Sequence, residues 1–174
     1  MRKKRLLQLT AALLCAVILS ACGGAPADAD YTCTVSISCA TILDNMDQCA
    51  ESKKELVPAD GVILPPTEVA FAEGESAFDV LQRVCRDNGI HLESKFTPVY
   101  NSAYIQGIHN IYEFDVGKLS GWMYAVNDWF PNYGCSLYQV QDGDVIRWVY
   151  TCDLGADVGG GQAAGDGQQE GASI

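Results

Sequence analysis

The sequence predicts an α+β fold in which one main helix packs on one face of a mixed β-sheet. Two observations support this prediction. Apolar and polar side chains alternate in residues 31–40 and again in residues 145–151, and this period of two is typical of half-buried strands. Between these segments, residues 76–89 combine the apolar spacing of a helix with start and stop signals.

The first expected strand covers residues 31–40, where every second side chain is apolar. The apolar positions expected on its buried face are Cys33, Val35, Ile37 and Cys39. Residues 41–66 are mixed in composition and contain three prolines, so we expect a long connection with a short helical turn. A second strand is expected at residues 69–71, which are Val, Ala and Phe.

The helix is the clearest element in the sequence. Ser76 can cap its first turn, and Asp79 three residues later nearly completes the pattern of a capping box. Gly89 is a typical helix stop. The side chains expected on the apolar side are Ala77, Leu81 and Val84, with Phe78 and Cys85 beside them.

Further strands are expected at residues 91–93, 104–105, 122–126 and 145–151. The last of these follows a tight Asp142-Gly143-Asp144 turn. Two strands thus precede the helix and the remaining strands follow it, without the regular alternation of an α/β fold. This order favours the α+β class.

Residues 1–21 have the order of a bacterial export signal. Basic residues at positions 2–5 precede an apolar run at 6–19, which is shorter than the roughly 20 residues that a membrane span needs. The signal ends in Leu-Ser-Ala-Cys, which resembles the lipobox of bacterial lipoproteins. We therefore predict that Cys22 carries lipid and holds the protein on the outer face of the bacterial cytoplasmic membrane. The alternative is an ordinary signal peptide followed by an incidental cysteine.

Composition divides the remaining chain into three parts. Residues 22–30 are small and polar, which predicts a flexible tether. Residues 31–154 hold most of the remaining apolar bulk and have the size of a single domain. Residues 155–174 are rich in Gly, Gln and Ala, so we expect a disordered tail.

The chain is acidic, with 11 basic against 22 acidic residues and a formal net charge of −11. Loss of the signal would remove four basic residues and leave the exported chain more acidic still. Nucleic acid is therefore not expected as a partner, because its recognition requires a basic surface. The same charge opposes broad contact with anionic lipid headgroups.

One cysteine lies in the predicted signal, and a second is predicted to carry lipid. An even set of cysteines remains, which in an exported protein predicts disulfides. Many pairings of this set are possible. One of them joins residues 135 and 152 in the C-terminal β region, closes a short loop from 39 to 49, and leaves 33 with 85. No C-x-x-C motif and no zinc-ligand spacing occurs. The disulfide candidates are Cys33, Cys39, Cys49, Cys85, Cys135 and Cys152.

Aromatic residues are densest between residues 120 and 135. Exposed rings offer flat apolar contacts with polar handles, which suit stacking on a planar ligand or gripping a protein. Trp129 and Phe130 precede a proline at a loop tip, where burial is difficult, whereas a core position explains Trp122 and Tyr124 at least as well. The candidate ligand-binding residues are Trp122, Tyr124, Trp129, Phe130 and Tyr133.

Other candidate sites are weaker. His91 or His109 could coordinate cobalt, but a surface position without such a role explains each of them better. Asp142 and Asp144 lack the further spaced ligands of a calcium site. No motif of an esterase, a zinc protease or a phosphate-binding loop occurs. We therefore expect no catalytic residue and no metal site, and we do not expect an enzyme.

Three segments carry a resemblance to a known family. They are E-G-E-S-A-F-D-V-L at 73–81, G-W-M-Y-A-V-N at 121–127 and D-G-D-V-I-R-W-V-Y at 142–150. Together they resemble the C-terminal domain of transcobalamin and intrinsic factor, and related domains of bacterial exported proteins, over residues 33–152. The resemblance implies a β-grasp fold and cobalamin as a candidate ligand. By motif position, it implies ligand contacts for Trp122 and Tyr124.

In the vertebrate carriers this domain closes over cobalamin held by a helical barrel, which we do not expect within this sequence. A ligand would therefore be bound by this domain alone or jointly with a separate barrel protein. The sequence predicts a lipid-anchored extracytoplasmic binding protein for cobalamin, a related corrinoid or another small ligand. The alternative is a protein-interaction module that docks a helical-barrel or cell-surface partner through residues 129–133.

Overall fold

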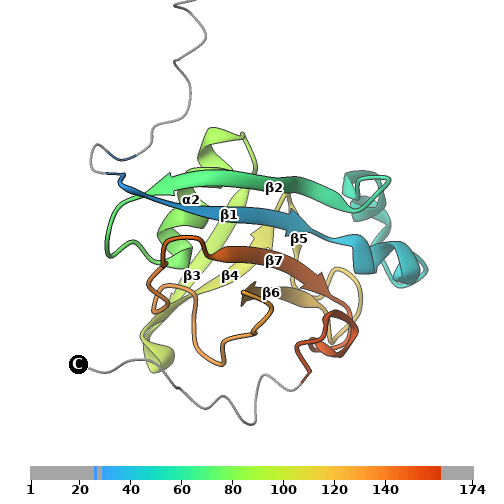
Figure 1. Ribbon diagram of the computed structural model, residues 1–174. Coiled ribbons are helices and arrows are strands. Elements are labelled where there is room, and N and C mark those ends of the chain that lie inside the picture. The colour runs from blue at the N-terminus through green and yellow to red at the C-terminus, as the bar shows by residue number, and fades with distance from the viewer. Residues whose placement is uncertain (1–25, 27–28, 162–174) are drawn as a thin grey trace, which may run out of the picture.

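The computed structural model describes residue 26 and residues 29–161 of the chain (Figure 1). The predicted signal peptide, the lipidation site Cys22 and most of the tether lie outside the described residues, as does the chain after residue 161. Within the described part, no helix is both long enough and apolar enough to cross a membrane.

Four strands form a mixed sheet (Figure 1). They are β1 (Tyr31–Ser38), β2 (Val62–Phe71), β6 (Gly121–Val126) and β7 (Val145–Thr151), in the order β2-β1-β7-β6. β1 and β7 run parallel although they are the first and last strands, while β2 and β6 pair antiparallel with their neighbours. The predicted alternation in the two central strands is confirmed by their buried positions, which include Val35, Ile37, Ile146 and Trp148.

β2 begins at Val62 and is much longer than the predicted strand at 69–71. It contains Pro65 and Pro66, which cannot donate a hydrogen bond to a neighbouring strand. Because β2 lies at the edge of the sheet, it pairs on one side only and tolerates both prolines. The register of the β1–β2 pair shifts on both sides of Ile37, close to these prolines. Our prediction of a connection up to residue 66 was wrong because prolines mark edge strands as well as loops.

Helix α2 (Ala77–Asp87) covers one face of this sheet (Figure 1). The expected capping box is confirmed: the Asp79 N–H donates to Ser76 Oγ at 3.2 Å, and the Ser76 N–H donates to the Asp79 carboxylate at 2.9 Å. Gly89 has a φ of +65° just beyond the C-cap, as its predicted role as a stop requires. The buried face of the helix consists of Ala77, Val80, Leu81, Val84 and Cys85.

The other strands form a second, antiparallel sheet in the order β3-β4-β5. They are β3 (Leu92–Thr97), β4 (Ser102–Ile108) and β5 (Ile111–Tyr112), and the 3-10 helix η3 (Pro98–Tyr100) joins the first two. The predicted α+β class is confirmed, but the strands are divided between two sheets instead of one. β5 was missed because two residues are too few to show periodicity. The parallel first and last strands beside α2 agree with a β-grasp arrangement.

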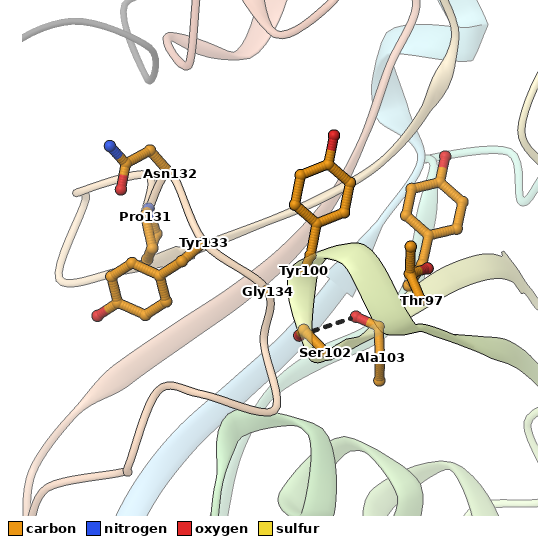
Figure 2. A pocket seen from close by; sticks show the side chains of 9 residues that line it. Thr97, Tyr100, Ser102, Ala103, Pro131, Asn132, Tyr133 and Gly134 are labelled. Atoms are coloured by element: carbon orange, nitrogen blue, oxygen red, sulfur yellow. Dashed lines mark hydrogen bonds between the residues drawn. The ribbon is translucent and has the colours of Figure 1, made fainter.

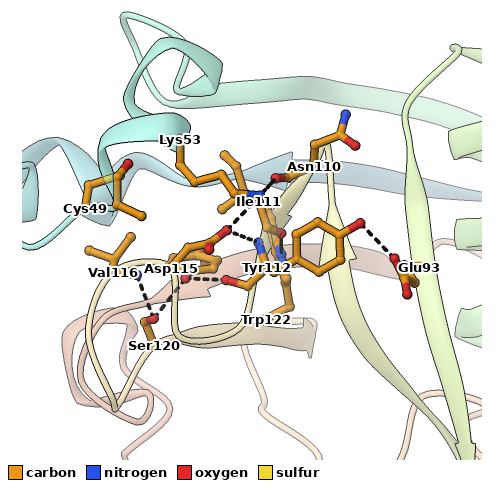
Figure 3. Close-up of polar contacts among 12 residues, drawn as sticks. Cys49, Lys53, Glu93, Asn110, Ile111, Tyr112, Asp115, Val116, Ser120 and Trp122 are labelled. Atoms are coloured by element: carbon orange, nitrogen blue, oxygen red, sulfur yellow. Dashed lines mark hydrogen bonds and ion pairs between the residues drawn. The ribbon is translucent and has the colours of Figure 1, made fainter.

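The connection between β1 and β2 contains two 3-10 helices, η1 (Ala40–Asn45) and η2 (Glu51–Leu56). Lys53 attaches η2 to the segment around β5 (Figure 3). Its Nζ donates to the Asn110 carbonyl at 2.7 Å, lies 3.3 Å from the Asp115 carboxylate and sits 4.6 Å from the centre of the Tyr112 ring. These contacts hold the long connection against the second sheet.

The described chain continues beyond the predicted domain end at residue 154. The 3-10 helix η4 (Ala156–Val158) follows β7, and Asp157 accepts a hydrogen bond from the Cys152 N–H at 2.7 Å. Gly160 packs so tightly that an added Cβ would lie 2.9 Å from the Phe130 ring. The predicted start of the tail at 155 was therefore too early, and the part from 162 onward lies outside the described residues.

Candidate binding groove

A groove of about 440 Å³ lies between the β3–β4 hairpin and the loop that follows Trp129 (Figure 2). Its volume falls within the roughly 300–1,000 Å³ that is usual for small-molecule sites. The hairpin contributes Thr97, Tyr100, Ser102, Ala103 and Tyr104. The loop contributes Pro131, Asn132, Tyr133 and Gly134.

The turn of the hairpin places Tyr100 at the rim of the groove. Pro98 starts η3, and Asn101 ends it in the left-handed conformation with a φ of +46°. Asparagine adopts this conformation more readily than most residues, so the local sequence explains the tight turn. The Tyr100 side chain is 72% exposed, which leaves its ring available for contact.

The floor of the groove is formed where the loop approaches β4. An added Cβ on Gly134 would lie 1.7 Å from Ser102 Oγ, so only glycine permits this approach. Ser136 fastens the loop further, because its Oγ lies 2.9 Å from Ser102 Oγ and accepts a hydrogen bond from the Ala103 N–H at 3.0 Å. The two walls of the groove are thereby joined at its base.

Tyr133 forms the loop wall, and its ring packs edge-on against Trp129 with 5.9 Å between ring centres. Trp129 follows a tight turn in which both Asn127 and Asp128 have positive φ, the pattern of a two-residue hairpin turn. The Asn127 side chain also accepts a hydrogen bond from the Val145 N–H at 2.9 Å. Asn127 is therefore a turn-forming residue that places Trp129.

No lining residue of the groove carries a formal charge. Burial, followed by a hydrogen bond to Glu113, raises the pKa of Tyr104 to about 12. Burial also raises the pKa of Tyr133. Both phenols therefore stay protonated at neutral pH. Tyr104 donates its proton to the Glu113 carboxylate, so its oxygen can only accept from a ligand, whereas the Tyr133 hydroxyl can donate. The arrangement suits an uncharged, flat ligand that stacks on rings and accepts hydrogen bonds.

Three of the five predicted ligand-binding side chains are buried, which corrects their assignment. Trp122, Tyr124 and Phe130 are 9%, 8% and 6% exposed. The Trp122 indole donates to the Ile111 carbonyl at 2.8 Å, and the Tyr124 ring stacks on Trp148 with 5.5 Å between centres. For Trp122 and Tyr124 the alternative of a core role is the one that the structure supports.

Of the remaining candidates, Tyr133 lines the groove and Trp129, 41% exposed, supports it. Phe130 is buried instead of exposed, and Gly160 packs against its ring. Sequence reasoning missed the hairpin wall with Thr97, Tyr100 and Tyr104. Two tyrosines around a Pro-x-x-Asn turn could have indicated this wall. We predicted only a strand in this region.

The six cysteines of the described residues are free thiols in the structure. The pairing of Cys135 with Cys152 stays a prediction. The Cys135 carbonyl accepts a hydrogen bond from the Phe78 N–H of α2, and the Cys135 sulfur lies 3.7 Å from the Ala103 carbonyl. The Cys152 N–H donates to the Asp157 carboxylate beside η4.

In the described residues, no group of three or more His, Cys, Asp or Glu is placed to hold a metal. Asp144 accepts from the Tyr138 hydroxyl and from the Gln141 N–H, each at 2.8 Å. The His109 N–H donates to the His91 carbonyl at 2.8 Å. Both histidines lie at the end of the hairpin opposite the groove.

Comparison with known proteins locates a related domain within the chain. The model of one family, described as a domain of unknown function (DUF4430), matches residues 74–152. None of the curated proteins matches the sequence.

Two solved structures are similar in fold. One is haptocorrin in complex with Cbi, at 14% identity and a TM-score of 0.49, covering 71% of this chain and 26% of the haptocorrin chain. The other is a protein from Ruminococcus gnavus ATCC 29149 for which metal binding has been suggested, at 15% identity and a TM-score of 0.42, covering 70% and 97%. This chain thus spans about a quarter of the haptocorrin chain, and both likenesses concern the fold alone.

Proposed function

We propose that this chain is a lipid-anchored extracytoplasmic binding protein that captures a small ligand between Tyr100 and Tyr133. The observation that carries the proposal is the groove of about 440 Å³, in which tyrosines from two distant segments meet without a charged lining residue. Sites of this kind bury most of a small ligand and orient it with a few polar groups. Here the phenol groups and the Asn132 amide would supply them.

Cobalamin or a related corrinoid is the first ligand to test, because of the sequence resemblance over residues 33–152. A corrinoid is larger than the groove, so the groove would hold one edge of it. The rest of the ligand would remain accessible to a second protein, such as a separate helical-barrel protein. Smaller planar or hydroxylated neutral molecules would fit the same lining completely and form the second set of ligands to test.

Binding is best measured by calorimetry on the purified protein, with Tyr100→Ala and Tyr133→Ala as test variants. Loss of one stacked ring should weaken affinity about tenfold, corresponding to roughly 1.4 kcal/mol. Phe114→Ala is the matched control, because Phe114 is also an exposed aromatic residue but does not line the groove. Saturable binding that none of the three substitutions alters would rule out this groove as the site.

The anchor is tested at Cys22. Growth with a labelled fatty acid should label the wild-type chain but not Cys22→Ser, and only the wild type should partition with membranes. The tether at residues 22–30 would reach at most about 30 Å, which allows the domain to stand clear of the bilayer. Equal labelling of both chains would contradict lipidation at this residue.

A second candidate function is protein docking, favoured by the apolar surface beside the groove. Val99 and Phe96 are 87% and 60% exposed on the same hairpin as Tyr100. Contiguous exposed apolar residues of this kind often mark interaction sites. Val99→Ser should then abolish copurification of a cell-envelope protein while calorimetric ligand binding stays unchanged. The two functions are separated because Val99 is not among the groove residues.

A further inference from the structure

β1 and β7 are parallel neighbours that finish at the same end of the sheet, and a cysteine follows each of them (Figure 1). Cys39 follows β1, and Cys152 follows β7. Because these strands are parallel and Ser38 is paired with Val149, the next position after Ser38 lies beside Tyr150. Cys152 comes two residues after Tyr150, directly beyond the end of β7. The two sulfur-bearing residues therefore lie at one edge of the core.

Cys49 is brought back to the same region by the fold of η1. Thr41 at its start donates to the Tyr150 carbonyl at 2.5 Å and accepts from the Asn45 side chain at 2.9 Å. The chain then turns, and the Ala50 N–H donates to the Asp115 carbonyl at 2.8 Å. Figure 3 shows Cys49 next to Val116, in the segment that Ser120 connects to the Tyr150 hydroxyl at 2.9 Å.

The three thiols differ in accessibility and therefore in reactivity. Cys39 is fully buried, and burial, together with nearby charges that include Cys49 and Cys152, raises its pKa to about 12. Burial also raises the pKa of Cys49, and burial followed by the charges of Asp157 and Cys49 raises that of Cys152. Cys152 alone of the three is partly exposed. An oxidant therefore reacts first with Cys152. Of the two other thiols, Cys39 is the poorer nucleophile for attack on the oxidised Cys152.

We propose that Cys49 and Cys152 form an oxidisable pair, whose disulfide fastens the end of β7 to the η1–η2 connection. The Cys152 thiolate attacks a small-molecule disulfide and releases one thiol, leaving a mixed disulfide on Cys152. The Cys49 thiolate then attacks the Cys152 sulfur and releases the second thiol. Two protein thiols lose their protons and two electrons, and the small disulfide is reduced to two thiols. The new bond would constrain about a hundred residues of the unfolded chain, which raises the melting temperature.

The experiment treats the full reduced chain with oxidised glutathione, blocks the remaining thiols and maps cross-linked peptides by mass spectrometry. A Cys49–Cys152 peptide should appear, lighter by two hydrogens than the sum of its reduced halves. It should persist in Cys39→Ser and in Cys135→Ser, which removes the partner inferred from sequence alone. In Cys49→Ser, a glutathione adduct should instead accumulate on Cys152.

Three results would overturn the pairing: a wild-type chain in which Cys49 and Cys152 both remain free, a Cys152 linked to another cysteine, or a glutathione adduct that persists on Cys152 in the wild type. The wild-type peptide map decides the question without any variant, so a substitution that impairs folding leaves the test intact. A measured rise in melting temperature on oxidation, reversed by reductant, checks the mechanical consequence independently.

Discussion

The hydroxyl of Tyr124 donates a hydrogen bond to the backbone carbonyl of Tyr133 at 2.9 Å. This contact joins a buried ring of β6 to the loop that forms one wall of the groove. Tyr124 also stacks on Trp148 of β7, so its position is determined by the main sheet. The wall of the candidate site is therefore held by the core, through a residue that sequence reasoning assigned to the ligand itself.

Tyr124→Phe keeps the stacked ring and removes only the donor to Tyr133. We expect the free energy of unfolding to fall by about 1 kcal/mol, because one hydrogen bond is lost and a carbonyl loses its partner. Ligand affinity should fall as well, since the Tyr133 wall is no longer fixed. Denaturant unfolding and calorimetry measure the two effects.

The control for this substitution is Tyr138→Phe, which removes a hydrogen bond to Asp144 and none to the loop wall of the groove. It should lower stability by a similar amount without changing affinity. If both variants weakened binding equally, the effect would follow from general stability and not from the groove wall.

Gly134→Ala should disturb the base of the groove. Its Cβ would meet Ser102 Oγ at 1.7 Å, and forcing the loop away from β4 should cost about 1–3 kcal/mol of stability. Gly121→Ala is the matched control, because the nearest atom to its Cβ is 3.8 Å away. Thermal unfolding of the two variants should differ clearly. Equal melting temperatures would show that the loop does not approach β4 this closely.

Ser76→Ala should destabilise helix α2 by about 1 kcal/mol, because it removes the acceptor of the Asp79 N–H. The helix carries one face of the core, so the loss should appear in global unfolding rather than as local fraying. Ser94→Ala, at an exposed position of β3, serves as the control and should leave the unfolding midpoint nearly unchanged. A midpoint shift no larger than that of the control would contradict the capping role.

Tyr104 should make stability fall at high pH. Its pKa of about 12 in the folded protein exceeds the ordinary value of about 10, so the folded state holds the proton more tightly. The stabilisation from this group is complete below pH ~10 and is lost as the pH rises through ~12. Ultraviolet titration should show one phenol fewer ionising near pH 12 in Tyr104→Phe.

The contribution of Glu113 to this titration can be separated from burial. Glu113→Gln removes the carboxylate that accepts the Tyr104 hydrogen bond, so the pKa should move partway toward its ordinary value while burial keeps it raised. Glu93→Gln, which affects the neighbouring Tyr112 instead, should leave the Tyr104 titration in place. A Tyr104 pKa that stayed unchanged in Glu113→Gln would assign the whole shift to burial.

The sequence by itself determined the elements with strong local signals. Alternation predicted β1 and β7, and the cap at Ser76 with the stop at Gly89 predicted α2, because these patterns arise from contacts within a few residues. Local signals were insufficient where the position in the sheet decides the outcome. We interpreted two prolines as part of a loop, but both belong to β2. An edge strand tolerates them because it needs hydrogen bonds on one side only.

The tertiary structure alone decided which aromatic rings face a cavity. Trp122 and Tyr133 belong to the same aromatic-rich segment of the sequence. In the structure, Trp122 packs against Tyr150 in the core, whereas Tyr133 lines a groove opposite Tyr100. The groove joins segments some thirty residues apart, and the proposed pair of Cys49 and Cys152 would join segments a hundred residues apart. No local pattern encodes such meetings, because they follow from how strands are ordered and how connections fold back over the sheet.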